Sequence, residues 1–311
     1  MDQRHSFTVS LPNAELVEAL GTQQGVDATM WAMDGPAPRN AIDLVVVPYM
    51  SPPSILRSLA GVHTQLVQSQ TIGFEGVSAE LPMGVRYSNA AGVHEASTAE
   101  LALGLMIAAQ REIGMYARAQ VRGEWRHHKS RALTDSRVMV IGNGAVGRAI
   151  AARLEPFEVD VVRVATRGSV DGPRTIFGVD QLPSLLGEVD IVVLAVPLNA
   201  STTGLVDRGF LQRMKRGSLL VNVSRGPVVV TQDLLKAVAS KHVRAALDVV
   251  DPEPLPPDHP LWGLDDVLMT PHVGGHSEAM TPRVVALVRR QIAALQSGSE
   301  PHNVVVDRRF R

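Results

Sequence analysis

Apolar residues recur along this chain in two periods, one typical of strands and one typical of helices. The run at 42–47, IDLVVV, is rich in β-branched residues, as in strands that are buried on both faces. Alternating strands and helices predict a small α/β unit with a parallel sheet over the first 99 residues. Its strands are predicted at 7–9, 28–31, 42–47, 66–69 and 85–88, and its helices at 13–20 and 54–60.

A second alternating series begins at Arg137. Six predicted strands with helices between them are typical of a doubly wound sheet, which binds ligands at the carboxyl ends of its strands. The strands are predicted at 137–141, 159–164, 191–196, 218–223, 244–249 and 267–269, and the helices at 146–154, 180–187, 207–214 and 231–239.

Two further helices lie outside these series. Residues 94–117 are apolar on most helical faces, which predicts one long helix buried between two domains or two subunits. Residues 283–295 are amphipathic and follow the last predicted strand, so we expect the chain to return there to the first domain.

The predicted organisation is two Rossmann- or flavodoxin-like α/β domains with parallel sheets and an active site in the cleft between them. We expect the substrate-binding domain at 1–99 plus 277–311, and the dinucleotide-binding domain at 100–276.

The composition narrows the class of protein. The chain has 311 residues, a formal net charge of −1 and no cysteine, so nothing indicates a nucleic-acid or anionic-membrane surface, and disulfides and thiolate metal sites are excluded. Neither a signal peptide nor an apolar run of membrane-spanning length is visible, and we expect a cytoplasmic protein. His127 and His128 are adjacent, which predicts a solvated loop in preference to a metal site, so we expect no metal.

The stretch Arg137–Gly147, RVMVIGNGAVG, predicts a dinucleotide site. An apolar strand ends in a G-x-G-x-x-G turn, and a helical pattern follows. The first glycine permits the tight turn, the second lets a pyrophosphate approach the backbone, and the third lets the helix pack against the strand. The start of the helix offers unpaired N–H groups to the phosphates.

Chemically active side chains follow three later strands. Arg225 comes after the predicted strand at 218–223, Glu253 after 244–249 and His272 after 267–269. An Arg provides a two-donor fork for a carboxylate or carbonyl oxygen, a His can transfer a proton near neutral pH, and a carboxylate beside it orients the ring. Together they favour hydride transfer to a 2-keto acid, with a nicotinamide as the hydride carrier.

Five stretches resemble the D-isomer-specific 2-hydroxyacid dehydrogenase family, which includes glyoxylate/hydroxypyruvate reductases and 3-phosphoglycerate dehydrogenases. They are GVHEASTAELALGLM (92–106), VIGNGAVGRAIAARLEPF (140–157), LLVNVSRGPVV (219–229), AALDVVDPEPLPPDHPLW (245–262) and MTPHVGG (269–275). The resemblance implies that Arg225 binds the substrate's carboxylate and carbonyl oxygen, that His272 is the acid/base, and that Glu253 is its partner.

The resemblance also implies further contacts. The backbone N–H groups of Ile72 and Gly73 would bind the substrate carboxylate, although Gly73-Phe74-Glu75 stands where the family more often has Asp. Asp248 would reach the nicotinamide amide, and the region 94–130 would form a homodimer. The expected cofactor site comprises Gly142, Asn143, Gly144, Ala145, Val146, Gly147, Thr166, Arg167, Val196, Pro197, Thr203, Val223, Ser224, Asp248 and Gly274.

The end of the strand at 159–164 bears on the choice of cofactor. NAD enzymes place an acidic residue there for the ribose 2′-hydroxyl, but this chain has Ala165, followed by Thr166 and Arg167. A hydroxyl and a guanidinium suit a 2′-phosphate, so the sequence favours NADP(H) over NAD(H).

The predicted function is reduction of a small 2-keto acid of the glyoxylate/hydroxypyruvate type to the D-2-hydroxy acid, with His272 as proton donor. Two alternatives stay open. The family includes corepressors that bind NAD(H) and peptides without catalysis, and a phosphite-type dehydrogenase shares the Arg–Glu–His set. Turnover of a 2-keto acid would separate them.

Overall fold

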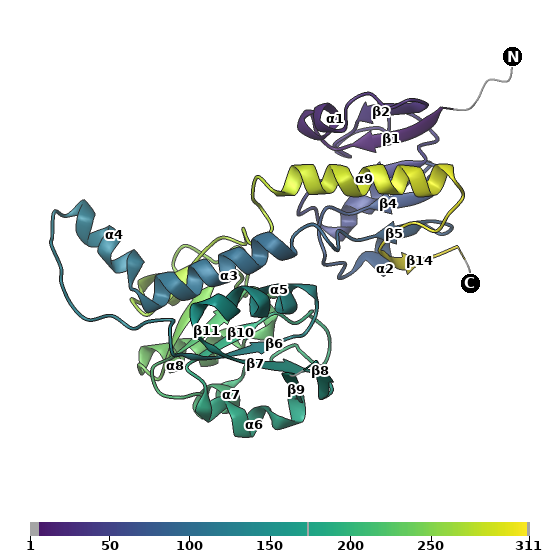
Figure 1. Ribbon diagram of the computed structural model, residues 1–311. Helices are drawn as coiled ribbons and strands as arrows, with labels where there is room; N and C mark the ends of the chain where they lie inside the picture. Colours follow the sequence, from purple (N-terminus) through teal and green to yellow (C-terminus); the bar gives the residue numbers. More distant parts are fainter. Residues whose placement is uncertain (1–5, 173, 310–311) are drawn as a thin grey trace, which may run out of the picture. The chain divides into compact units, whose positions relative to one another are not determined.

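The computed structural model of the protein describes residues 6–172 and 174–309. The chain divides into two compact units, Met1–His94 with Gly275–Arg311, and Glu95–Gly274 (Figure 1). The sequence placed these boundaries after residues 99 and 276. Within the described residues, no helix is both long and apolar enough to cross a membrane.

The first unit is built on a six-stranded sheet in the order β14-β5-β4-β3-β1-β2. Its strands pair in parallel except β14, which is antiparallel to β5. The elements are β1 (Phe7–Leu11), α1 (Ala14–Leu20), β2 (Val26–Met30), β3 (Leu44–Val46), the 3-10 helix η1 (Pro53–Leu59), β4 (Leu66–Gln68), α2 (Val77–Glu80), β5 (Arg86–Ser88), α9 (Met280–Gln296) and β14 (Val304–Asp307).

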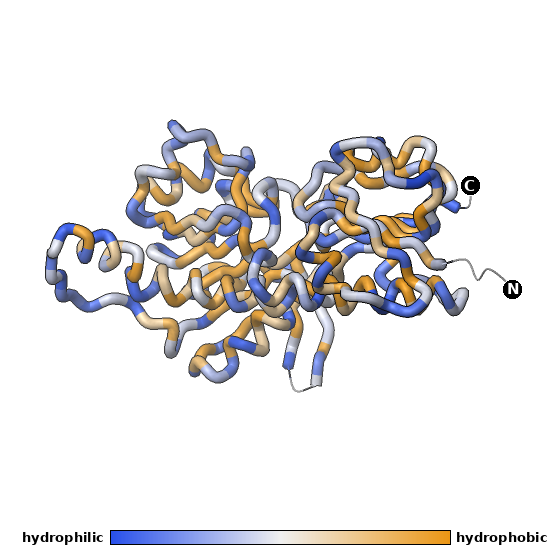
Figure 2. The backbone as a smooth tube through the Cα atoms, turned by 90° about the horizontal axis from the view of Figure 1, so that it is seen from above, coloured by the Kyte–Doolittle hydropathy of each residue, from blue (hydrophilic) through white to orange (hydrophobic). Residues whose placement is uncertain are grey.

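Two apolar layers enclose this sheet. Alternate residues along β3 point to opposite faces, so Leu44 and Val46 join α1 and α9 in one layer, while Val45 joins η1 and α2 in the other. Hydrophobic stretches, drawn in orange, run through the interior of each unit, whereas hydrophilic stretches lie mainly on its outside (Figure 2). The helix α9 follows the second unit in sequence, yet it supplies Val284, Val285, Leu287, Val288 and Ile292 to the core of the first.

The second unit is built on an eight-stranded sheet in the order β13-β12-β11-β10-β6-β7-β9-β8. The helices α3 and α5 cover one face, and α6, α7 and α8 cover the other. The elements are α3 (Glu95–Gln110), α4 (Ile113–Val121), β6 (Arg137–Ile141), α5 (Ala145–Leu154), η2 (Glu155–Phe157), β7 (Asp160–Ala165), β8 (Ser169–Asp171), β9 (Arg174–Gly178), η3 (Val179–Gln181), α6 (Leu182–Leu185), η4 (Leu186–Glu188), β10 (Ile191–Leu194), α7 (Arg208–Arg213), β11 (Ser218–Asn222), η5 (Gly226–Val228), α8 (Thr231–Ala239), β12 (Val243–Leu247), η6 (Pro260–Gly263) and β13 (Val267–Met269).

All six strands that the sequence predicted in this unit are present, and two were missed. The missed pair, β8 and β9, forms an antiparallel hairpin, and β9 continues the sheet beside β7. The three residues of β8 are exposed, so they lack the apolar run that identifies a buried strand.

The prediction of one helix over 94–117 was wrong. The helix breaks after Gln110, and Glu112 takes a left-handed backbone with φ 55° before α4 begins. Apolar periodicity continues through the break, which is why the sequence did not show it. In Figure 1, α4 and the segment after it extend away from the sheet of their own unit.

Candidate functional site

The glycine turn between β6 and α5 has the close packing that its spacing requires. Gly142 has φ 110°, and a Cβ there would lie 2.4 Å from the carbonyl oxygen of Ala195. A Cβ on Gly147 would lie 1.8 Å from the carbonyl oxygen of Gly142, so only glycine lets the helix approach the strand.

The middle glycine is different, because a Cβ on Gly144 would meet nothing within 4 Å. Gly144 is exposed at the N-terminus of the ten-residue helix α5, and Ala145 begins the helix. Open space in front of unpaired N–H groups at the positive end of a helix dipole fits the pyrophosphate of a dinucleotide. Val146, in the first turn of α5, is half-buried.

A buried charge that the sequence did not single out holds the second residue of this turn. The Arg163 side chain, 7% exposed, comes from the middle of β7. Its Nε and Nη2 donate to Oδ1 of Asn143 at 3.1 and 2.6 Å, and its Nη1 contacts Asp171 of β8 at 2.8 Å. Arg148 donates to the Asn143 carbonyl oxygen at 2.8 Å. The arginine therefore links the turn to the missed hairpin.

The strand ends beside the turn present the other predicted cofactor residues. At the end of β7, Ala165 is half-buried, while Thr166 and Arg167 are exposed. Past β10, Val196 is half-buried and Pro197 is exposed. Thr203 is exposed, and its hydroxyl donates to the carbonyl oxygen of Asn199 at 2.9 Å.

An Asn-centred turn after β11 positions Arg225. The Oδ1 of Asn222 accepts from the N–H and the hydroxyl of Ser224, at 3.0 and 2.7 Å, and its Nδ2 donates to the Arg225 carbonyl oxygen at 3.0 Å. Val223 and Ser224 are buried, whereas Arg225 is half-buried. A Cβ on Gly226 would lie 1.8 Å from the Val250 carbonyl oxygen, so glycine is needed where the next loop passes.

His272 and Glu253, which follow two different strands, meet in the structure. The Nδ1 of His272 lies 2.5 Å from Oε1 of Glu253. His272 has a left-handed backbone, with φ 53°, which is uncommon for a residue with a side chain. Glu253 thus fixes the Nδ1 side of the ring, and Nε2 makes no hydrogen bond with any other described residue.

The electrostatics of the pair keep the carboxylate charged. Burial alone would raise the pKa of Glu253. The hydrogen bond and the charge of His272 oppose this effect, and so do a backbone hydrogen bond and the charge of Arg225. The pKa of Glu253 is therefore held below its usual value. A carboxylate that stays ionised beside Nδ1 can accept the hydrogen of that nitrogen and so orient the ring.

Asp248 organises the loop that carries His272. Its Oδ1 accepts from the Thr270 hydroxyl at 2.6 Å and from the Val273 N–H at 2.9 Å, and its Oδ2 accepts from the Gly274 N–H at 2.8 Å. A Cβ on Gly274 would lie 2.9 Å from that second oxygen. Asp248 is 3% exposed, and its contact with a nicotinamide stays a prediction.

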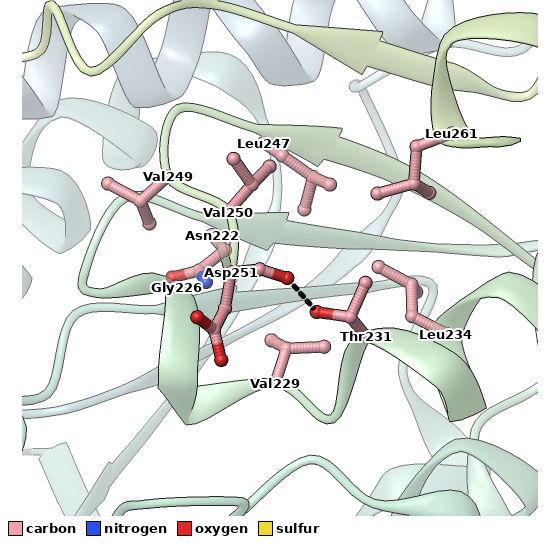
Figure 3. Close-up of a pocket in the computed structure, with 10 residues that line it drawn as sticks. All are labelled: Asn222, Gly226, Val229, Thr231, Leu234, Leu247, Val249, Val250, Asp251 and Leu261. Atoms are coloured by element: carbon pink, nitrogen blue, oxygen red, sulfur yellow. Dashed lines mark hydrogen bonds between the residues drawn. The ribbon is translucent and has the colours of Figure 1, made fainter. Parts of the chain in front are cut away.

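A small pocket lies beneath the loop that leads to Glu253 (Figure 3). It is lined mainly by apolar side chains, and the Thr231 hydroxyl donates to the Asp251 carbonyl oxygen at 2.6 Å across it. We interpret it as packing behind the site. No group of three or more His, Asp or Glu side chains suited to a metal gathers in the parts of the chain that the structure describes.

The predicted carboxylate-binding loop belongs to the first unit, whereas the residues above belong to the second. The Asn89 side chain donates to the Ile72 carbonyl oxygen at 2.8 Å, and the Thr71 hydroxyl donates to that of Gly73 at 3.2 Å. Among the described residues, no group accepts a hydrogen bond from the N–H of Ile72 or of Gly73. Two half-buried N–H donors are therefore left for an anion.

Comparison with known proteins identifies the family. The NAD binding domain of D-isomer specific 2-hydroxyacid dehydrogenases matches residues 103–274. The chain belongs to the D-isomer specific 2-hydroxyacid dehydrogenase family. It is 31% identical over 279 residues to glyoxylate reductase/hydroxypyruvate reductase from Mus musculus, covering 84% of this chain and 85% of the relative.

Two other members of the 2-hydroxyacid dehydrogenase family extend the comparison. A glyoxylate reductase from Thermofilum pendens is 30% identical over 259 residues, which cover 79% of this chain and 76% of the relative. The crystal structure of a D-isomer specific 2-hydroxyacid dehydrogenase from Xanthobacter autotrophicus Py2, in complex with NADPH and MES, superposes with a TM-score of 0.81 at 29% identity. It covers 98% of this chain and 99% of the other. The predicted family and the two-domain α/β fold are confirmed.

Proposed function

We propose that this protein reduces a small 2-keto acid of the glyoxylate/hydroxypyruvate type to the D-2-hydroxy acid, with hydride from NADPH. The observation that carries the proposal is the 2.5 Å contact between His272 and Glu253, in the unit that also holds the Gly142–Gly147 turn. The named activities of the Mus musculus and Thermofilum pendens relatives support this substrate class.

Each residue has a distinct part in the proposed reaction. The Arg225 guanidinium binds the substrate's carboxylate and carbonyl oxygen, and the N–H groups of Ile72 and Gly73 bind the carboxylate. The reduced nicotinamide supplies the hydride to the carbonyl carbon. Imidazolium His272 gives its Nε2 proton to the carbonyl oxygen, which becomes the hydroxyl, and Glu253 holds the ring with Nε2 toward the substrate.

We propose a preference for NADPH from the end of β7. Ala165 stands where an acidic residue would accept from a ribose 2′-hydroxyl, and the exposed Thr166 and Arg167 suit a 2′-phosphate. NADPH in the related Xanthobacter autotrophicus structure supports this choice. Asp171, in the hairpin after β7, is a carboxylate that could oppose a phosphate, but its charge is paired with Arg163 at 2.8 Å.

A panel of 2-keto acids against both cofactors tests the proposal. Glyoxylate, hydroxypyruvate and phenylpyruvate are each assayed with NADPH and NADH, and we expect turnover with a higher kcat/KM for NADPH. A clear NADH advantage would reject the cofactor preference, and oxidation of phosphite alone would select the phosphite-type alternative. Tight cofactor binding without any turnover would favour the corepressor-like alternative.

The role of His272 is tested separately. We expect His272→Ala to lower kcat by about 10²- to 10⁴-fold, because the proton must then come from water. His276→Ala is the matched control, since His276 is an exposed histidine four residues along the chain. A His272→Ala enzyme with near wild-type kcat would reject the role.

A further inference from the structure

A buried histidine, His94, lies where the chain passes between its two units. The first unit ends its first segment at His94 and resumes at Gly275. Both residues belong to that unit, and they mark the two points at which the chain crosses between the units. The His94 side chain contacts Gly275 directly. His94 is 5% exposed and takes no part in the proposed reaction.

Both ring nitrogens of His94 face carbonyl oxygens. Nδ1 lies 3.0 Å from the Gly275 oxygen, and Nε2 lies 2.5 Å from the Gln70 oxygen. A carbonyl oxygen can only accept, so each nitrogen must carry a hydrogen. Either neutral tautomer would leave a ring lone pair against an oxygen. The geometry therefore fits the imidazolium ion, whose charge-assisted hydrogen bonds are short and strong.

Gly275 and Tyr49 pack closely against the His94 ring. A Cβ on Gly275 would lie 2.7 Å from Nδ1 of His94, so a side chain there would displace the ring. Tyr49, just beyond β3, covers His94 with a ring-centroid distance of 5.8 Å, and it also lies 5.3 Å from the ring of His276. The glycine is required by this close approach.

The other contact reaches the loop proposed to bind the substrate. Gln70 is two residues before Ile72, and its own side chain donates to the Val47 carbonyl oxygen at 2.8 Å. Ala90 donates from its N–H to the Thr71 carbonyl oxygen at 2.9 Å. These hydrogen bonds join the loop to the end of β3 and to the segment after β5. Through His94, the loop is also connected to Gly275, where the chain returns to the first unit.

We propose that His94 is a positioning residue, held as an imidazolium, that fixes the Gln70–Gly73 loop to both chain crossings and places a positive charge beside the site of an anionic substrate. The effect on substrate binding rests on the proposed function, whereas the protonation and the order of the loop do not. Attraction of a carboxylate by a buried cation adds to the two loop N–H donors.

The first test needs no turnover. Ring-¹⁵N-labelled wild-type protein is examined by long-range ¹H–¹⁵N NMR at neutral pH, and the His94 signals are assigned by their loss in His94→Gln. Two nitrogens of the protonated type are expected. The pattern of a neutral tautomer would overturn the imidazolium assignment, whether or not the protein reduces a keto acid.

The second test separates positioning from general stability. In His94→Gln and His94→Phe, we expect the KM for the keto acid to rise about tenfold, because the loop loses its fixed position and the substrate loses a nearby positive charge. The KM for NADPH should stay within about twofold of wild type. Hydrogen exchange should accelerate in peptides covering 69–73 and not in those covering β6. His276→Gln, the other histidine beside Tyr49, should change neither.

Unchanged keto-acid KM and unchanged exchange in His94→Phe would overturn the positioning role. Equal rises in both KM values, with faster exchange throughout the chain, would overturn it in favour of a general effect on stability. If no keto acid is turned over by the wild type, the exchange of 69–73 and the ring-nitrogen signals still decide whether His94 fixes the loop.

Discussion

The Glu253–His272 pair makes the stability of the folded protein depend on pH, and the carboxylate sets the direction of that dependence. The pKa of Glu253 in the folded protein lies below its usual value, because the His272 and Arg225 interactions outweigh the effect of burial. A lowered pKa means that the folded state holds this proton less tightly than the unfolded chain does. The stabilisation is therefore present above the unfolded pKa of a Glu, about 4.3, and is lost as pH falls through the lower folded value.

Thermal unfolding of wild type and Glu253→Gln as a function of pH measures this effect. We expect wild type to have the higher Tm at neutral pH, and the difference to shrink as the pH falls below the usual range of a carboxyl group. Glu278→Gln, an exposed carboxylate near the returning chain, is the control. A difference between wild type and Glu253→Gln that is constant down to acid pH would contradict the lowered pKa.

For individual residues, the sequence predicted the position of a side chain from the strand that it follows. Arg225, Glu253 and His272 were predicted as site residues because the carboxyl ends of parallel strands share one edge of a sheet, and the structure brings His272 and Glu253 together. Arg163 was not predicted, because it lies inside β7, where the sequence favoured burial of apolar residues. Only the partners supplied by Asn143 and Asp171 make a buried guanidinium possible there.

Arg163 also acts on an element, the glycine turn. The substitution Arg163→Met removes the arginine partner of the Asn143 side chain and the ion-pair partner that Arg163 gives to Asp171. The turn should lose its fixed geometry, so we expect the KM for NADPH to rise about tenfold with little change in the KM for the keto acid. Steady-state kinetics with each substrate varied in turn measure this.

Arg174→Met is the matched control for Arg163→Met. Arg174 starts β9 in the same hairpin, but its ion pair with Glu155 is about half exposed on both sides, and such pairs contribute little. An Arg163→Met enzyme with the NADPH KM of the Arg174→Met enzyme would contradict the proposed support of the turn.

The end of α3 depends on another buried arginine. Arg244 of β12 donates to the carbonyl oxygens of Gly217 and Ala109, at 3.2 and 3.1 Å, and to the side chain of Gln110, the last residue of α3. Burial lowers the pKa of Arg244 to about 10, which means that removal from water disfavours the charged guanidinium. The hydrogen bonds offset this desolvation cost. Arg244→Met would leave the acceptors unpaired, and we expect a loss of about 2–4 kcal/mol in the free energy of unfolding.

Chemical denaturation of Arg244→Met measures the loss. Arg118→Met is the control, because Arg118 lies on the exposed side of α4 and its Asp265 partner is 4.0 Å away and fully exposed. Equal stability of the two variants would show that Arg244 does not hold the end of α3.

The elements that the sequence missed have local causes. The strands β8 and β9 are joined through Gly172, which has φ 59°, and they present few apolar side chains to identify them. The break between α3 and α4 is a backbone event at Glu112, which leaves no mark on apolar spacing. Long apolar strands such as β10 and β11, in contrast, were placed to within two residues.

For the whole molecule, α4 and the segment that follows it bear on assembly. Three apolar side chains there are exposed, Ile113 at 49%, Val121 at 88% and Trp125 at 97%. Apolar side chains grouped on an extended segment are typical of a surface that a second subunit covers. The homodimer that the sequence predicts through the 94–130 region can therefore be tested at this surface.

Trp125→Glu tests that assembly. We expect the wild type to behave as a dimer in light scattering coupled to size-exclusion chromatography, and Trp125→Glu to shift toward the monomer, because the new charge would be buried without a partner. Val170→Glu is the control, since Val170 is 75% exposed on the β8 strand. A monomeric wild type, or equal masses for both variants, would contradict the proposed interface.

The return of the chain to its first unit has a consequence for synthesis on the ribosome. The second unit is complete once residue 274 has emerged, whereas the first unit waits for α9, which supplies Val288 and Ile292 to its core. Gln291 of α9, fully buried, donates to the Gln68 side chain of β4 at 2.7 Å, so a strand translated early acquires this partner late. The nascent chain must therefore keep a sheet face that still lacks α9 while its nucleotide-binding half is made, and a chaperone that masks apolar strands would act on residues 6–94 during that interval.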